Sequence, residues 1–175
     1  MSLSRRAFTV GLGAASLVRS AEAADPKGKS PVAQADEQPK FFDPHQFETV
    51  ASISELIIPA TDTPGAREAQ VARFLDQILA DSPETTRTAF LEGLWWTDGY
   101  CLRVEGKPFK DLNEQQQTQI FLTLLDSTDP AFETGRTFVQ AMKDWTTKIY
   151  YSTEIGEREL NKDGRVPSSY AQPCS

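Results

Sequence analysis

From Asp43 to Ile149 the apolar residues recur at three- and four-residue steps, the spacing that places them on one face of an α-helix. No run in this region alternates apolar and polar residues as a half-buried strand would. A chain with this pattern buries its apolar side chains by packing helices against one another. The sequence therefore predicts an all-α fold, and its 175 residues provide for one domain.

Proline and capping residues divide this region into five predicted helices. Asp43 followed by Pro44 is typical of a helix start, because aspartate accepts from the first free N–H groups and proline fits the first turn. The predicted helices run from Asp43 to before Pro59, from about Ala66 to Ala80, from Ser82–Pro83 to about Gly106, from Asn113 to before Ser127, and from about Ala131 to Ile149. We expect a small orthogonal or bundle-like domain of five helices with a loop-rich C-terminal tail.

The spacing within each helix also predicts which side chains point into the core. The expected inward residues include Val71, Phe74, Leu75, Ile78 and Leu79 in the second helix, Phe90, Leu91, Leu94 and Trp95 in the third, and Phe138, Met142 and Trp145 in the fifth.

The first residues of the chain have the features of an export signal. The basic pair Arg5–Arg6 precedes an apolar stretch over residues 7–18. That stretch is too short to cross a membrane, because the hydrocarbon core requires about 20 apolar residues. Ala21 and Ala23 supply the small residues that a signal peptidase requires at its cleavage site.

Phe8 identifies the kind of signal. It follows the arginine pair with one residue between, so this segment resembles a twin-arginine signal. The alternative is an ordinary amphipathic N-terminal helix. Because the twin-arginine export machinery carries folded cargo, we expect a periplasmic protein that binds its partner in the cytoplasm. We divide the chain into a disordered signal peptide (1–23), a flexible linker (24–42) and the helical domain (43–175).

The charge of the chain argues against nucleic acid as a partner. The formal net charge is -7, and removing residues 1–23 takes away three arginines and one glutamate, which leaves -9. A surface of that sign repels phosphate backbones, and no cluster of Lys or Arg compensates for it.

Few residues are available for metal or nucleophilic chemistry. His45 is the single histidine, and with two widely separated cysteines it does not make up a zinc, haem or iron–sulfur ligand set. No Gly-x-Gly-x-x-Gly motif follows a strand. We expect His45 to be an exposed residue near a helix start rather than the base of a catalytic triad. The expectation is that this chain has no catalytic, metal-binding or cofactor-binding residue.

Three other groups of polar side chains have competing interpretations. Asp62, in the turn Thr61–Gly65, is a candidate general base or cation ligand, although capping the turn is the simpler role. Glu154, Glu157 and Glu159 are expected to be solvated charges in a loop or short helix. Cys101 and Cys174 would form a disulfide in an oxidising compartment, or one of them would bond to a partner chain.

Several segments together resemble the family of gluconate 2-dehydrogenase subunit 3. The specific part is Leu56–Ala66, which reads LIIPATDTPGA, followed by residues 71–76. The segments Gly106–Phe109 and Tyr150–Gly156 and the late Cys174 also match, so with the leader the resemblance covers nearly the whole chain.

The resemblance implies a non-catalytic subunit of a periplasmic dehydrogenase associated with the inner membrane. In such complexes a large flavoprotein of the glucose-methanol-choline type, which holds FAD, oxidises a sugar, sugar acid or polyol, and a cytochrome c subunit commonly accepts the electrons. The small subunit supplies the leader and carries the large one outward. The alternatives are a free-standing periplasmic ligand-binding module and a hydrolase that acts through Asp62.

Adjacent aromatic residues predict where a partner docks. Trp95 and Trp96 point about 100° apart on a helix, so they cannot both lie centrally on a narrow core face, and Tyr150–Tyr151 present the same problem. An exposed apolar patch is typical of an interface. A wide core face is the alternative for the tryptophans. The candidate interface residues are Thr61, Asp62, Thr63, Pro64, Gly65, Trp96 and Tyr151.

Overall fold

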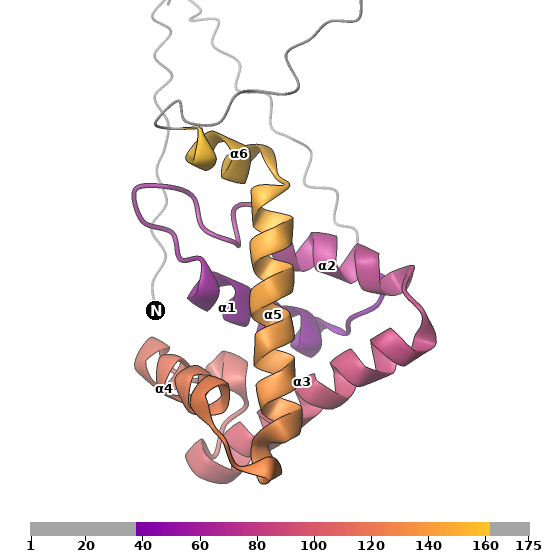
Figure 1. The fold of residues 1–175 in the computed structure, drawn as a ribbon, viewed down its shortest axis with the longest axis vertical. Coiled ribbons are helices and arrows are strands. Elements are labelled where there is room, and N and C mark those ends of the chain that lie inside the picture. Colours follow the sequence, from indigo (N-terminus) through magenta and orange to yellow (C-terminus); the bar gives the residue numbers. More distant parts are fainter. Residues whose placement is uncertain (1–37, 162–175) are drawn as a thin grey trace, which may run out of the picture. The chain divides into compact units, whose positions relative to one another are not determined.

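The computed structural model describes residues 38–161, and most of this part of the chain is α-helical (Figure 1). No strand occurs within it, and none of its helices is both long and apolar enough to cross a bilayer. The elements are α1 (Pro44–Ile57), α2 (Val71–Ala80), α3 (Glu84–Glu105), η1 (Phe109–Asp111), α4 (Glu114–Asp126), η2 (Pro130–Phe132), α5 (Glu133–Tyr151) and α6 (Glu154–Leu160), the two η elements being short 3-10 helices. The all-α prediction is confirmed. Helix α6 is a sixth helix beyond the five predicted, in a segment of the C-terminal tail for which the sequence left open a loop or a short helix.

Two of the predicted helix starts are correct because local capping determines them. Asp43 accepts from the Gln46 N–H at 2.8 Å, and the Gln46 side chain accepts from the Asp43 N–H at 3.0 Å. Asn113 begins α4 with the same reciprocal pair of bonds. Ser82 does not cap α3 as expected: its hydroxyl donates to the Ile78 carbonyl at 2.7 Å.

The second helix begins at Val71 rather than at Ala66. Residues 66–70 form a separate turn, in which Val71 N–H donates to the Ala66 carbonyl and Gln70 N–H to the Arg67 carbonyl, both at 3.0 Å. This pair of bonds is the Schellman arrangement that ends a helix. It places Gln70 in the left-handed conformation, with φ of 56°, so the backbone changes direction before α2.

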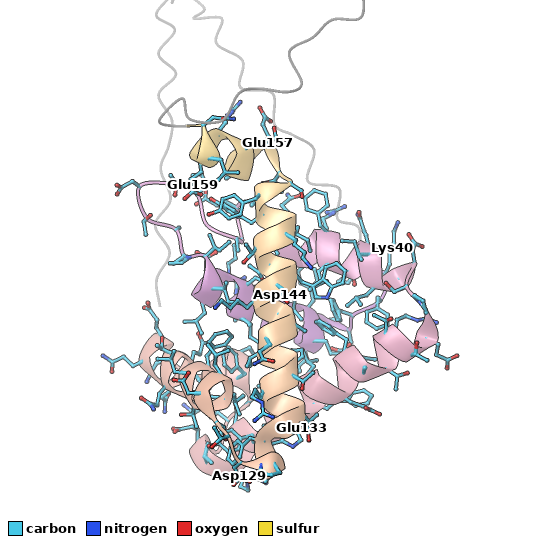
Figure 2. All side chains as sticks on the ribbon, viewed as in Figure 1. Lys40, Asp129, Glu133, Asp144, Glu157 and Glu159 are labelled. Atoms are coloured by element: carbon cyan, nitrogen blue, oxygen red, sulfur yellow. The ribbon has the colours of Figure 1, made fainter. Side chains whose placement is uncertain are left out.

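A buried carboxylate on α2 holds the segment that leads into α1. Asp76 is 2% exposed and accepts from the N–H groups of Lys40 at 2.6 Å, Phe41 at 3.0 Å and Phe42 at 2.8 Å. Figure 2 shows Lys40 beside α2. The Phe42 ring packs against Phe90 at a centroid distance of 5.7 Å. The sequence analysis placed Lys40, Phe41 and Phe42 at the end of a flexible linker. In the structure these three residues are part of the packed helical unit.

Helix α5 is at the centre of the fold. Every other α-helix in the described part of the chain contacts it. Figure 1 shows α4 on one side of α5, and α2 and α3 on the other. The largest fully buried side chains come from several of these elements and include Val50, Ile53, Leu75, Leu79, Leu94, Phe109, Leu124, Met142 and Tyr150.

Helices α3 and α5 approach closely because each has a glycine where the other has an aromatic ring. A Cβ atom on Gly93 of α3 would lie 2.5 Å from the Phe138 Cβ of α5. A Cβ atom on Gly135 of α5 would lie 2.2 Å from the Trp96 ring of α3. Both distances are shorter than carbon atoms tolerate, so any larger residue at either glycine would separate the two helices.

This close approach predicts opposite effects for two glycine substitutions in α3. Gly93→Ala should lower the free energy of unfolding by about 1 kcal/mol or more, because overpacking outweighs the gain of about 1 kcal/mol in helix propensity. Gly99→Ala is the matched control: nothing lies within 4 Å of its added methyl group, so we expect a gain of up to about 1 kcal/mol. Urea unfolding followed by circular dichroism measures both changes. If Gly93→Ala also stabilised the protein, the close contact with Phe138 would be wrong.

Candidate interaction surfaces

The turn Thr61–Gly65 is held by a carboxylate of α1. Glu55 accepts from the Ala60 N–H at 2.9 Å and from the Arg67 N–H at 2.8 Å. The backbone passes so close to Glu55 that a Cβ atom on Gly65 would lie 2.5 Å from the Glu55 carboxylate and from the Ala60 nitrogen. The role expected for Asp62, holding the turn through its own side chain, therefore belongs to Glu55.

The candidate residues of this turn differ in their exposure. Thr61, Asp62 and Pro64 are exposed, Thr63 is half-buried and Gly65 is buried. The exposed members are accessible to a partner, whereas Gly65 acts on the shape of the turn. Their place in an interface stays a prediction.

Tyr150 connects this turn to α6. Its ring is fully buried, and its hydroxyl lies 2.8 Å from the Pro64 carbonyl and 2.6 Å from the Glu159 carboxylate. Figure 2 shows Glu159 on α6, near the C-terminal end of α5. Burial, followed by the hydrogen bond to Glu159, raises the pKa of Tyr150 to about 12. Glu159, expected to be a solvated charge, therefore has a structural role. Tyr151 is half-buried, with its ring edge-on to Tyr150.

The two adjacent tryptophans have different environments. Trp96 covers Gly135, stacks on Tyr100 at 5.6 Å between ring centroids and meets Phe132 edge-on at 5.7 Å. Trp95, which was expected to point inward, is 57% exposed. The prediction that the pair cannot share one core face agrees with this arrangement. Trp96 supports the contact between α3 and α5, and Trp95 is the more exposed member of the pair. The place of Trp96 in an interface stays a prediction.

Of the two cysteines, Cys101 lies among the described residues. Cys101 on α3 is fully buried as a free thiol, and burial, with a smaller effect of Asp98, raises its pKa to about 12. A group with this pKa is protonated and unreactive near neutral pH. Cys174 lies outside the described residues, as do Arg5, Arg6, Phe8, Ala21 and Ala23 of the expected signal. The disulfide and the signal therefore stay predictions.

His45 is not simply an exposed surface residue. Its Nε2 lies 2.7 Å from Asp98 Oδ2, and the side chain is 41% exposed. A carboxylate accepts from an N–H group, so Nε2 carries the proton in this contact. Asp98 also accepts from the Phe109 N–H at 2.9 Å. The pair therefore joins α1, α3 and η1, and Asp98 is a residue that the sequence analysis did not identify.

An apolar groove lies between α2 and the second half of α5. We call it the α2–α5 groove; its walls are Phe74 and Ile78 of α2 and Trp145, Lys148 and Ile149 of α5, continued by residues 152 and 153. Phe74 is 42% exposed and Ile78 is 37% exposed, although both were expected to point into the core. Core packing on α2 is carried by Val71, Ala72, Leu75 and Leu79.

A second groove continues along α5. It lies between α5 and the first half of α3, and its lining includes Ala89 and Glu92 of α3 and Thr137, Ala141 and Trp145 of α5. Trp145 belongs to both grooves. The sequence carried one signal for the α2–α5 groove: the apolar face of α2, from Val71 to Leu79, is wider than one core contact requires.

Within residues 38–161 no group of three or more His, Cys, Asp or Glu side chains is arranged to hold a metal ion. The family model described as Gluconate 2-dehydrogenase subunit 3 matches residues 44–162, which include all six described α-helices. No curated protein and no solved structure matches the chain.

The contacts of Tyr150 predict a loss of stability at high pH. Its pKa is raised above the unfolded value of 10.0 to about 12, so its contribution is complete below pH 10 and is lost as pH rises towards 12. Tyr150→Phe should cost about 1 kcal/mol near neutral pH and make the decline above pH 10 shallower. Urea unfolding at several pH values measures both effects.

The matched control is Tyr151→Phe. The Tyr151 ring contacts Tyr150, but the Tyr151 hydroxyl forms no hydrogen bond with the turn Thr61–Gly65 or with α6. The raised pKa of Cys101 also lowers the free energy of unfolding at high pH. This effect is the same in wild type and in both variants, so it cancels when they are compared. An equal decline in wild type and Tyr150→Phe would contradict the assignment.

Proposed function

The chain belongs to the gluconate 2-dehydrogenase subunit 3 family and is therefore a subunit of a dehydrogenase complex, in which we propose that it is the accessory subunit that binds, stabilises and co-exports a flavin-dependent large subunit. The large subunit holds FAD and oxidises a sugar, sugar acid or polyol. A cytochrome c subunit receives the electrons, and the complex works in the periplasm at the inner membrane.

The observation that carries this proposal is the extent of the family match. It covers residues 44–162, from the first turn of α1 to beyond the end of α6. The relationship therefore concerns the whole helical unit rather than one turn motif, and the proposed role belongs to that unit.

The surface of the helical unit supports binding to a partner. Large apolar side chains remain exposed on α2: Phe74 at 42% and Ile78 at 37%. Exposed apolar side chains that gather in patches are typical of surfaces that another protein covers. Removing them from water on association supplies binding free energy of about 25 cal/mol per Å² before the entropic costs of association.

The expected leader supports the direction of transport. The pair Arg5–Arg6 lies outside the described residues, and its role rests on the sequence pattern. A machinery that accepts folded cargo exports whatever is already bound to the folded small subunit. One leader is then sufficient for two chains.

Co-expression tests the proposal directly. The large subunit is produced with and without this chain, and dye-linked dehydrogenase activity is measured in periplasmic and cytoplasmic fractions. We expect periplasmic activity to fall to background without this chain. With the double variant Arg5→Lys, Arg6→Lys, we expect activity to accumulate in the cytoplasm, because the complex forms but its signal is not read. Arg19→Lys, a lysine exchange elsewhere in the same leader, should leave export unchanged.

Two outcomes would contradict the proposal. One is a large subunit that reaches the periplasm in full amount without this chain. The other is a purified small subunit that oxidises a sugar or hydrolyses a substrate unaided.

A further inference from the structure

The two grooves beside α5 share Trp145, and the residues of α5 that line them follow one strip of its surface. Along α5 it runs from Thr134 through Ala141 and Trp145 to Ile149, a rise of about 23 Å at 1.5 Å per residue. Helix α3 borders its first half and α2 its second half. A strip of this length accommodates about four turns of a helix laid along it, as in complexes where an amphipathic helix occupies a groove between helices.

Helix α2 has apolar residues on more than its core side. Leu75 and Leu79 are fully buried against the rest of the fold, whereas Phe74 and Ile78, one turn apart, lie on a neighbouring side and remain exposed. The one carboxylate of this helix, Asp76, is directed inward to the backbone of residues 40–42. A surface helix normally places charged residues on its outer side. The part of the α2 surface with Phe74 and Ile78, which has no carboxylate, is therefore suited to being covered.

The α2–α5 groove also has an unusual charge for this protein. The chain has a net charge of -7, yet the lining of the groove contains no carboxylate and one cation, Lys148. Among the described residues, no Asp or Glu forms an ion pair with Lys148. The groove thus offers a row of apolar side chains with one unpaired positive charge at its edge.

We propose that the α2–α5 groove is where the dehydrogenase large subunit docks, through an apolar segment with a carboxylate opposite Lys148. This inference rests on the proposed function and specifies the surface that performs it. Phe74, Ile78 and Trp145 receive the apolar side chains of that segment. The partner's carboxylate pairs with Lys148, which fixes the direction in which the segment lies.

Charge disfavours two other occupants. The side chains of residues 162–175 include Lys162, Arg165 and one anion, Asp163, so this segment would bring further positive charge to Lys148. A second copy of the chain would bring together two molecules that each carry a net charge of -7. A partner with a local acidic residue has neither disadvantage.

Site-specific photo-crosslinking identifies the occupant. A photoreactive residue is introduced as Ile78→benzoylphenylalanine in the full chain, which is co-expressed with the large subunit. The control is Leu102→benzoylphenylalanine, at an exposed leucine of α3 outside both grooves. We expect position 78, and not position 102, to give a product with the combined mass of the two different chains.

The other products each overturn the inference. A product of twice the mass of this chain identifies a second copy in the groove, and an internal crosslink to residues 162–175 identifies the tail. A complex that forms without any crosslink from position 78 shows that the groove is not the interface.

Affinity measurements provide a second test. Ile78→Glu places an unpaired carboxylate in the apolar groove, and we expect the affinity for the large subunit to fall at least about 30-fold, the loss typical of a hot-spot residue. Leu102→Glu, the matched control, should bind as wild type does. Lys148→Glu should weaken binding, whereas Lys143→Glu, with the same change in net charge on the same helix, should not. Circular dichroism confirms that each variant is folded.

Failure of this inference can be distinguished from failure of the proposed function. If wild type binds the large subunit and Ile78→Glu binds equally well, the groove is wrong and the accessory role stands. If wild type itself does not bind the large subunit, the accessory role is wrong and the groove assignment falls with it.

Discussion

The rest of the structure depends on the close approach of α3 and α5. Phe138 occupies the space over Gly93, and Trp96 occupies the space over Gly135, so each helix accepts a ring from the other. Because α5 contacts every other described α-helix, the position of α3 against it sets where the remaining helices pack. The same crossing directs Trp96 inward and leaves Trp95 at the surface. Which of the two tryptophans is exposed on α3 is therefore a consequence of two glycines.

The parts of the fold that were predicted correctly are those that neighbouring residues determine. Asp43 with Gln46 and Asn113 with Gln116 form capping boxes within four residues, so the starts of α1 and α4 are readable from the sequence. The start of α2 could not be read from the sequence, because Gln70 adopts a left-handed conformation for which the usual signal is glycine. Helix α6 had a readable signal that was not used: Thr153 accepts from the Gly156 N–H, and acidic residues follow in the first turn.

The candidate surface was harder to predict because it depends on contacts between distant residues. The periodicity of α2 marks Phe74 and Ile78 as apolar, but only the position of α5 decides that they remain exposed. The turn Thr61–Gly65 also depends on a contact outside its own residues. The carboxylate that holds it belongs to Glu55 on the preceding helix rather than to Asp62 within the turn. Sequence spacing identifies which side chains can be buried; tertiary packing decides which of them are.

Helix α2 brings together the features on which the proposed role depends. Asp76 binds the backbone of Lys40, Phe41 and Phe42, so the chain that arrives from the N-terminal side is attached to this helix. Leu75 and Leu79 fix the helix in the core, and Phe74 and Ile78 form a wall of the groove. A partner bound in that groove would contact the same short helix to which the N-terminal segment is tied. Export of the leader and retention of the partner would then depend on one ten-residue element, in which Leu75 and Leu79 face the core and Phe74 and Ile78 face the groove.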